Sequence, residues 1–292
     1  MRSMLFVPGD RPDRFAKAAA SGADAVILDL EDAVAAERRP LARAAIASWL
    51  REGSREVPMW VRINPVQSST LHTSDALQDL VAVMPGRPDG IILPKARNGA
   101  DVTQLDHWLE ALELAEGLPV GSTSVIPMIT ETAGAMLNLA SFVPTIKRVR
   151  GMTWGAEDLA TELGASGNRD ATGQYEMPYQ LASAGCLYTA AAAAVASIDT
   201  VDTEIKDLAA VESRARASRR AGYSGKLAIH PAQIAALHAA FTPSAEEVAH
   251  AERVLAVFAQ APASGAFMVD GKLVDRPHVL QAERVLAAAG RR

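Results

Sequence analysis

The sequence predicts a (β/α)8 TIM barrel followed by a C-terminal helix–hairpin–helix extension. Short apolar runs alternate with helical stretches eight times within residues 1–241. These runs are apolar throughout rather than alternating, which is typical of parallel strands buried on both faces. The alternative is an open doubly wound sheet. No Gly-x-Gly-x-x-Gly follows the first apolar run and no Walker-type phosphate loop is present, so a nucleotide site of that fold has no support.

Each predicted strand ends at a turn-forming or charged dipeptide. Pro8-Gly9 ends the first strand, Glu31-Asp32 the second, Asn64-Pro65 the third, Pro94-Lys95 the fourth and His230-Pro231 the last. The predicted strands cover residues 3–7, 25–30, 59–63, 90–93, 124–130, 149–154, 198–202 and 225–229.

Helical stretches fill the intervals, and the first begins with Pro12 at a favoured first-turn position. The predicted helices cover residues 12–20, 40–50, 74–84, 100–116, 132–141, 178–197, 204–221 and 232–240. A polar, glycine-bearing loop over residues 164–177 precedes the long alanine-rich helix.

Residues 242–292 are predicted to form a separate extension. Ser244 and Glu247 form a capping box for a helix to about residue 260. Asp270-Gly271 between two apolar runs is a strong hairpin signal, and a last helix covers residues 277–289. We expect the extension to bury no core of its own. It should pack on the barrel, cover the active face or reach a neighbouring subunit.

Composition narrows the class of protein. Of 292 residues, 49% are hydrophobic, the net charge is −5, and basic residues are scattered, which argues against nucleic acid as the main partner. The single cysteine, Cys186, fits a reducing compartment. No apolar run approaches the roughly 18 residues of a membrane helix. We therefore expect a cytoplasmic protein with neither a membrane nor a nucleic-acid partner.

Charged residues gather at the carboxyl ends of the predicted strands, which meet at one mouth of a TIM barrel and there form active sites. Glu131 and Asp158 end successive strands and would suit a hard cation such as Mg²⁺, although acids also cap helices. Arg62 would bind a substrate carboxylate through two parallel hydrogen bonds, or it would form a structural ion pair with Glu31 or Asp32. Backbone N–H groups of Gly155, Ala156, Glu157 and Asp158 would hold another carboxylate oxygen at a helix start.

Seven segments that end or follow the predicted strands occur in order along the chain. They are Leu5-Phe6-Val7-Pro8-Gly9, Leu28-Asp29-Leu30-Glu31-Asp32-Ala33-Val34, Val61-Arg62-Ile63-Asn64, Leu93-Pro94-Lys95, Glu131-Thr132-Ala133-Gly134, Gly155-Ala156-Glu157-Asp158-Leu159 and Ile229-His230-Pro231. Together they resemble the citrate lyase beta-subunit-like family of the HpcH/HpaI aldolase superfamily, which includes malyl-CoA and citramalyl-CoA lyases. The resemblance covers nearly the whole chain, extension included.

The resemblance implies a magnesium-dependent active site. Glu131 and Asp158 match the family's two Mg²⁺ ligands, and Arg62 matches the arginine that grips the keto-acid part of the substrate. Asp32 matches an acid near the metal that acts through water. Asp275 matches an acid that enters a neighbouring subunit's active site, which implies a trimer or hexamer; its alternative role is to cap the last helix before Pro277.

The resemblance also implies a thioester substrate. Phe6, Arg11 and Lys17 resemble positions that hold the CoA nucleotide; otherwise they are an apolar core residue and two solvated helix charges. The implied reaction splits a malyl-, citramalyl- or citryl-type 3-hydroxyacyl thioester into an acetyl-type thioester and a 2-oxo acid. The loop over residues 164–177 lies where the acyl group would be selected.

Three alternatives stay open. The chain would be the beta subunit of a citrate lyase complex, acting on a citryl thioester on an acyl carrier protein. It would be a CoA-independent pyruvate aldolase, which does not need the extension in this form. It would be a non-catalytic barrel that serves as a binding subunit, which the intact Arg62, Glu131, Asp158 and Asp275 disfavour.

Overall fold

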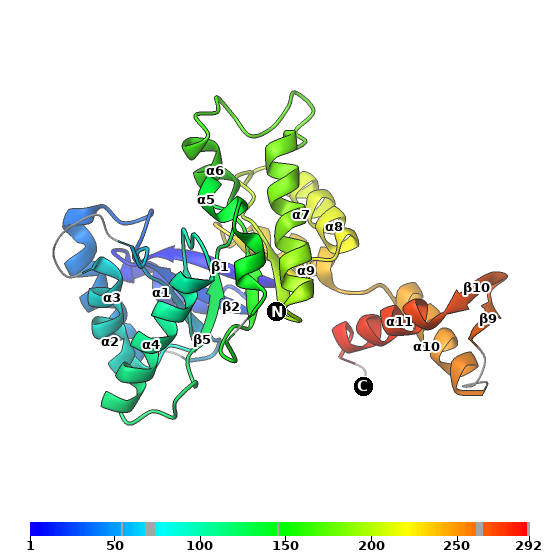
Figure 1. Ribbon diagram of the computed structural model, residues 1–292, viewed down its shortest axis with the longest axis horizontal. Coiled ribbons are helices and arrows are strands. Elements are labelled where there is room, and N and C mark those ends of the chain that lie inside the picture. The colour runs from blue at the N-terminus through cyan, green and yellow to red at the C-terminus, as the bar shows by residue number, and fades with distance from the viewer. Residues whose placement is uncertain (54, 68–73, 145, 261–264, 291–292) are drawn as a thin grey trace. The chain divides into compact units, whose positions relative to one another are not determined.

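The computed structural model describes residues 1–53, 55–67, 74–144, 146–260 and 265–290. The chain forms two compact units, Met1–Leu237 and His238–Arg292 (Figure 1). The first unit contains a parallel sheet with helices around it, and the second contains two helices and a hairpin.

The strands of the first unit form one parallel eight-stranded sheet among the described residues. Its order is β5-β4-β3-β2-β1-β8-β7-β6, as expected of a barrel in which neighbours in sequence are neighbours in space. The strands are β1 (Ser3–Pro8), β2 (Ala25–Asp29), β3 (Met59–Arg62), β4 (Gly90–Leu93), β5 (Ser124–Pro127), β6 (Gly151–Thr153), β7 (Ala196–Asp199) and β8 (Gly225–Ala228).

The sheet closes between β5 and β6. At one end, the Val125 amide donates to the Arg148 carbonyl at 2.8 Å and the Arg150 amide donates to the Val125 carbonyl at 3.0 Å. At the other end, the Ile129 amide donates to the Thr153 carbonyl at 2.9 Å. The prediction of a TIM barrel is therefore confirmed.

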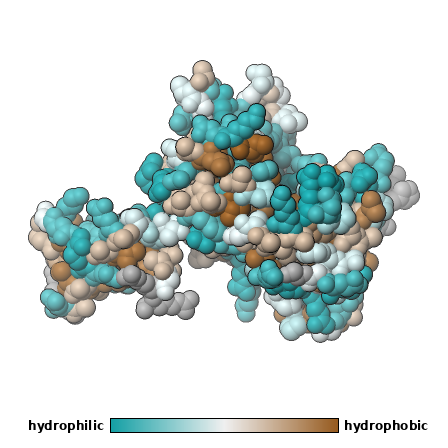
Figure 2. All heavy atoms as spheres, turned by 180° about the vertical axis from the view of Figure 1, so that it is seen from behind, coloured by the Kyte–Doolittle hydropathy of each residue, from teal (hydrophilic) through white to brown (hydrophobic). Residues whose placement is uncertain are grey.

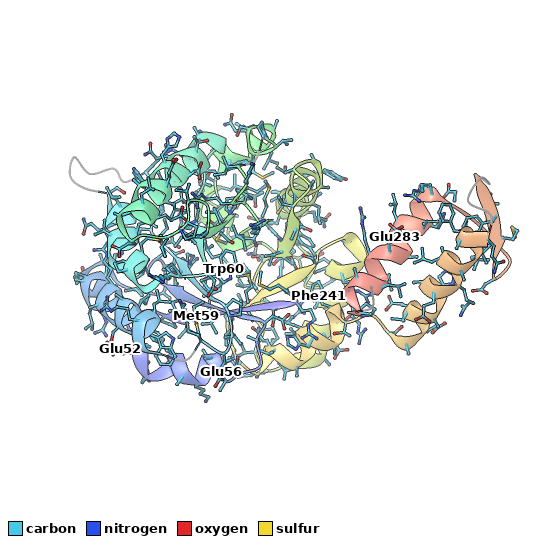
Figure 3. All side chains as sticks on the ribbon, turned by 90° about the horizontal axis from the view of Figure 1, so that it is seen from below. Glu52, Glu56, Met59, Trp60, Phe241 and Glu283 are labelled. Carbon is cyan, nitrogen blue, oxygen red and sulfur yellow. The ribbon has the colours of Figure 1, made fainter. Side chains whose placement is uncertain are left out.

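Apolar side chains fill the inside of the barrel. Ile27 of β2 and Trp60 of β3 lie at paired register positions and belong to one buried cluster; Trp60 is labelled in Figure 3. The buried members of this cluster are Met4, Ala25, Ile27, Trp60, Ile92, Ile126, Met128, Ile198 and Leu227. A filled interior means that a ligand has to bind at a mouth of the barrel rather than through it.

Helices cover the outside of the sheet (Figure 1). The α-helices are α1 (Phe15–Ala19), α2 (Arg39–Glu52), α3 (Asp75–Val83), α4 (Gly99–Ala115), α5 (Ala133–Met136), α6 (Ala156–Glu162), α7 (Met177–Ala192), α8 (Leu208–Ala221) and α9 (Gln233–Phe241). The 3-10 helices are η1 (Pro12–Arg14), η2 (Ala36–Arg38), η3 (Met84–Gly86) and η4 (Leu139–Phe142).

Two helices differ from their predicted ranges for local reasons. The helix predicted over 178–197 ends at Ala192, because Ala194 adopts φ +54° and the Val195 amide returns to the Ala190 carbonyl at 3.0 Å. The helix predicted from 204 begins at Leu208, because the Asp207 side chain caps it by accepting from the Ala210 amide at 3.0 Å.

The second unit contains α10 (Ala245–Gln260), β9 (Ala266–Val269), β10 (Lys272–Asp275) and α11 (Arg276–Ala288). Asp270 and Gly271 have φ of +50° and +75°, so the predicted Asp-Gly hairpin is confirmed. The expectation that this segment buries no core was wrong. Its helices and hairpin enclose a small apolar cluster of Ala251, Val254, Val269, Val274, Val279 and Ala282.

Hydrophilic and hydrophobic residues are intermingled on the face drawn in Figure 2. Among the described residues, no helix combines the length and the apolar character that crossing a bilayer requires.

Candidate active site

The carboxyl ends of the strands form one cavity of about 230 Å³. Arg62 is the last residue of β3, Glu131 follows β5, and Asp158 lies in the first turn of α6. Eight of the predicted site residues line this cavity: Phe6, Asp32, Arg62, Glu131, Gly155, Ala156, Glu157 and Asp158. The fold therefore brings together most of the residues that the sequence singled out.

The Arg62 guanidinium is buried and held from two sides. Its Nε and Nη2 donate to the two oxygens of Asp29 at 2.7 and 2.6 Å, and Nη1 lies 3.1 Å from Glu31 Oε2. Its Cζ also stands 4.7 Å from the centroid of the Phe6 ring. A bidentate carboxylate pair fixes the plane of the guanidinium, so Arg62 reaches the cavity in one orientation.

Asp29, which supplies this pair, was not among the predicted site residues. It lies in β2 two residues after Ile27, which faces the barrel interior, so its side chain points to the same side. A carboxylate at an inward position of an apolar strand was the signal in the sequence.

Glu131 is almost completely buried, at 2% exposure, and its carboxylate is closely confined. The Lys95 amide donates to its Oε2 at 2.6 Å. Gly155 borders the other oxygen so closely that a Cβ there would lie 2.6 Å from Oε1. Burial raises the pKa of Glu131 well above 4.5, and the nearby Asp158 and Glu31 raise it further.

Lys95 joins the acids at the mouth. Its Nζ lies 2.9 Å from Asp32 Oδ2 and 3.0 Å from Asp158 Oδ1, and it also donates to Glu31 Oε1. Burial lowers the pKa of Lys95, but the carboxylates raise it by more, so the net shift is upward. The sequence placed Lys95 at a strand end but did not predict these contacts. They depend on the side-chain conformation of Lys95 and on the barrel, which brings the acids from other strand ends within its reach.

The turn that opens α6 leaves backbone donors at the cavity. Gly155 is the N-cap residue and has no side chain to occupy the first-turn amides. Glu157 accepts a hydrogen bond from Asn168 Nδ2 at 2.8 Å, which connects the loop 164–177 to the site. Tyr175 of the same loop packs edge-on against Trp154, with ring centroids 5.2 Å apart.

A second cavity of about 360 Å³ adjoins the first, since Phe6 and Ile229 line both. Lys17 and Arg14 line this second cavity. Arg11, in contrast, lies outside its lining and forms an ion pair with Asp13 at 2.8 Å, with both side chains exposed. Of the two predicted nucleotide-binding cations, Lys17 borders a cavity and Arg11 does not.

Asp275 lies in the second unit, as the N-cap residue of α11. Its Oδ1 is 2.5 Å from His278 Nδ1, and its side chain is 49% exposed. It thus occupies the capping position that the sequence gave as its alternative role. An exposed carboxylate also remains accessible to another molecule.

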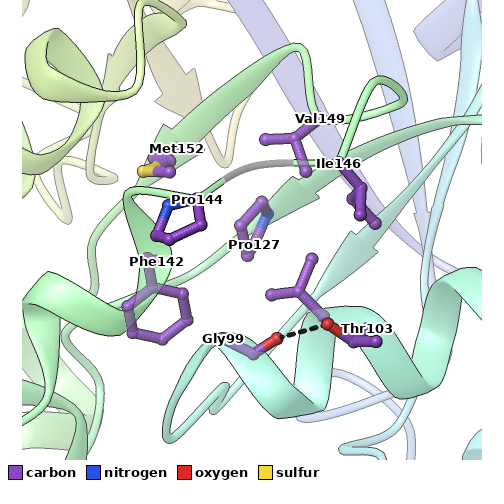
Figure 4. A pocket seen from close by; sticks show the side chains of 9 residues that line it. Gly99, Thr103, Pro127, Phe142, Pro144, Ile146, Val149 and Met152 are labelled. Atoms are coloured by element: carbon purple, nitrogen blue, oxygen red, sulfur yellow. Dashed lines mark hydrogen bonds between the residues drawn. The ribbon is translucent and has the colours of Figure 1, made fainter.

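A third, very small cavity of about 10 Å³ lies between α4, η4 and the β5–β6 side of the barrel (Figure 4). Its lining is mainly apolar, with Phe142, Val149 and Met152, and the Thr103 hydroxyl is satisfied by the Gly99 carbonyl at 3.2 Å. It has no room for an organic ligand, so it belongs to the packing of the barrel.

The donor set fits a magnesium ion. Within the described ranges, no group of three or more His, Cys, Asp and Glu residues is arranged to hold a metal. Glu131 and Asp158 offer two carboxylates, and Mg²⁺ is commonly held by one or two carboxylates with water and substrate completing its shell. Burial, together with the nearby Asp158 and Glu31, raises the pKa of Glu131, and a divalent cation beside these acids would favour their charged forms.

Comparisons with known proteins show the family to which the chain is related. The family model described as HpcH/HpaI aldolase/citrate lyase matches residues 2–231. The citrate lyase subunit beta-like protein of Mycobacterium tuberculosis is 36% identical over 288 residues, which cover 98% of this chain and 94% of that protein. The (3S)-malyl-CoA thioesterase of Cereibacter sphaeroides is 34% identical over 291 residues, which cover 99% and 94%.

Among solved structures, protein CitE from Mycobacterium tuberculosis in complex with magnesium, acetoacetate and coenzyme A has a TM-score of 0.79 and 35% identity. The alignment covers 99% of this chain and 98% of that one. The fold and site define a TIM-barrel enzyme of the lyase class. The chain belongs to the HpcH/HpaI aldolase/citrate lyase family.

The raised pKa of the buried Glu31 allows a prediction of how the free energy of unfolding depends on pH. Burial raises its pKa to about 7, although Arg62 and Lys95 act to lower it. Between its ordinary pKa of 4.5 and about 7, the folded protein keeps a proton that the unfolded chain has lost, so stability falls as pH rises through this window. Relative to Glu31→Gln, the metal-free wild type should lose about 1–2 kcal/mol between pH 5 and pH 7.

Urea unfolding in EDTA at pH 5, 6 and 7 measures this difference. Glu37→Gln, at an exposed position of η2, is the matched control and should keep the wild-type pH dependence. Parallel curves for wild type and Glu31→Gln would contradict the proposed protonation of Glu31.

Proposed function

We propose that the protein is a Mg²⁺-dependent lyase that cleaves a 3-hydroxyacyl thioester of the malyl, citramalyl or citryl type. The products are an acetyl-type thioester and a 2-oxo acid. The observation that supports this most is the convergence of Arg62, Glu131 and Asp158 on one cavity. The solved relative with magnesium, acetoacetate and coenzyme A supports the same substrate class.

The proposed roles follow from charge and position. Glu131 and Asp158 hold the cation, and Asp32 acts near it through water. Arg62, oriented by Asp29, binds the carboxylate of the 2-oxo acid part and stabilises the oxygen that gains charge. When bound, Mg²⁺ supplies Lewis acidity beside that oxygen.

The bond changes balance without a redox partner. The hydroxyl loses its proton and becomes the carbonyl of the 2-oxo acid, while the adjacent C–C bond breaks. Its electron pair moves into the enolate of the thioester, which takes up one proton at carbon to give the acetyl group. We propose Asp275 as the group that carries this second proton, and as the base that removes it in the condensing direction.

Asp275 is proposed to act in the site of a neighbouring subunit. Its half-exposed carboxylate is available to a second copy of the chain. A contribution of this kind needs a closed assembly, for which we propose a trimer or hexamer.

The thioester arm is proposed to follow the second cavity. Phe6 lies where the two cavities meet, and Lys17 would face the phosphates of CoA, with Arg11 as a further cation nearby. Gly155, Ala156 and Glu157 are proposed to hold substrate oxygen through their backbone donors. The same site would accept a thioester on an acyl carrier protein, as in a citrate lyase beta subunit.

A second candidate activity is hydrolysis of the thioester itself. It is favoured by the 34% identity to a (3S)-malyl-CoA thioesterase over nearly the full chain. Hydrolysis releases free CoA and a hydroxy acid, whereas C–C cleavage releases a 2-oxo acid, so one assay separates the two. A non-catalytic binding role is the remaining alternative.

The test incubates the purified full chain with Mg²⁺ and, separately, malyl-CoA, citramalyl-CoA and citryl-CoA. The proposal expects a 2-oxo acid from one of them, abolished by EDTA and restored by Mg²⁺. Arg62→Lys, which loses the bidentate fork, should lower turnover by about 100-fold. Release of free CoA without a 2-oxo acid would establish hydrolysis instead. Neither product, with Mg²⁺ still bound, would point to a carrier-protein substrate.

Glu131 as a metal ligand is tested through its neighbour Gly155. In Gly155→Ala, the new Cβ would lie 2.6 Å from Glu131 Oε1 and 2.7 Å from Cγ, so the carboxylate has to move. Calorimetry should show Mg²⁺ binding weakened by about 10- to 100-fold. Gly134→Ala is the matched control, since its Cβ would meet nothing closer than 3.9 Å. Equal Mg²⁺ affinity in both variants would refute the assignment.

A further inference from the structure

The Lys95 ammonium occupies the charged mouth of the barrel. It lies 3.0 Å from Asp158 Oδ1 and 2.9 Å from Asp32 Oδ2, and its side chain is 26% exposed. It therefore binds one of the two proposed metal ligands directly. A cation already seated on Asp158 and a divalent cation that needs Asp158 have to compete for the same carboxylate.

The backbone of Lys95 binds the other proposed ligand. Its amide donates to Glu131 Oε2 at 2.6 Å. Lys95 has φ +49°, a left-handed conformation that side-chain-bearing residues rarely adopt. A strained residue thus links Glu131 and Asp158, through its main chain to one and its side chain to the other.

Arg62 does not duplicate this role. Its Nε and Nη2 are used by Asp29, and its Nη1 faces Glu31 at 3.1 Å and Asp32 at 3.9 Å. Asp158, in contrast, forms its ion pair with Lys95.

We propose that Lys95 is a positioning residue that acts as an exchangeable internal counter-ion. In the metal-free enzyme, its ammonium neutralises Asp158 and Asp32 and keeps the mouth assembled. With a divalent cation bound to the carboxylates, the Lys95 ammonium would leave Asp158, while the Lys95 amide would still donate to Glu131. This inference rests on the proposed function, because it takes Glu131 and Asp158 as the metal ligands.

The exchange has two measurable consequences. Mg²⁺ binding requires the Lys95 ammonium to leave Asp158, which costs free energy. The wild-type protein should therefore bind Mg²⁺ more weakly than the same site without the ammonium. The ammonium also offsets repulsion among the acids, so its removal destabilises the metal-free protein. A lysine that only helped to build the metal site would have the opposite effect on affinity.

The experiment measures binding of Mg²⁺ alone to Lys95→Met by calorimetry, with thermal unfolding in EDTA and in Mg²⁺. We expect Lys95→Met to bind Mg²⁺ about tenfold more tightly than wild type. The variant lacks the partly exposed Lys95–Asp158 ion pair, which in wild type has to break before Mg²⁺ binds. We also expect a lower Tm in EDTA and a larger rise on adding Mg²⁺. Arg97→Gln removes a charge two residues away that pairs with Asp101, and should leave Mg²⁺ affinity within about twofold of wild type.

Lys95→Gly is the second variant, because glycine adopts φ +49° without strain and keeps the amide that binds Glu131. It should also bind Mg²⁺ more tightly than wild type. Unchanged or weaker binding in both Lys95 variants, with wild-type binding intact, would overturn the counter-ion role and leave the proposed function standing. Absence of Mg²⁺ binding in wild type and variants alike would overturn the metal site and this inference together.

Discussion

An excess of carboxylates over cations at the mouth of the barrel governs the active site. Two cations, Arg62 and Lys95, contact or closely face a larger set of acids: Asp29, Glu31, Asp32, Glu131 and Asp158. Acids crowded in a buried position resist ionisation, which is why Glu31 and Glu131 have raised pKa values. A divalent cation would relieve this crowding, so the same charge imbalance that weakens the metal-free fold favours metal binding.

The barrel creates this imbalance by its geometry. Parallel strands that close into a ring bring residues far apart in sequence to one edge, and Asp29 and Arg62 meet because their strands are in register there. Much of this followed from the sequence, since the strands, their polar ends and the Asp-Gly hairpin are local signals. Asp29 was missed although its alternation with Ile27 was visible in the sequence. The contacts of Lys95 did not follow, because the groups that a long side chain reaches are set by the closed ring. The small core of the second unit was missed because its apolar residues come from two helices and a hairpin that pair only in three dimensions.

Substrate choice would then depend on segments attached to this charged centre. Asn168 binds Glu157, and Tyr175 packs on Trp154, so the loop 164–177 is anchored at the cavity by both ends. We propose that variation of this loop changes which acyl group the site accepts and leaves the acidic residues of the cavity in place. The family to which the chain belongs contains relatives named for different reactions, which fits a shared centre with variable surroundings.

The most direct test is to locate a divalent cation in crystals of the full chain soaked with Mn²⁺ and a 2-oxo acid. The account predicts an anomalous peak bonded to one oxygen of Glu131 and one of Asp158, at about 2.2 Å, a typical metal–carboxylate distance. The Lys95 ammonium should have moved off Asp158, and the 2-oxo acid should lie between the cation and Arg62. A peak elsewhere, or none with the 2-oxo acid bound, would contradict the central claim that these acids form a metal site.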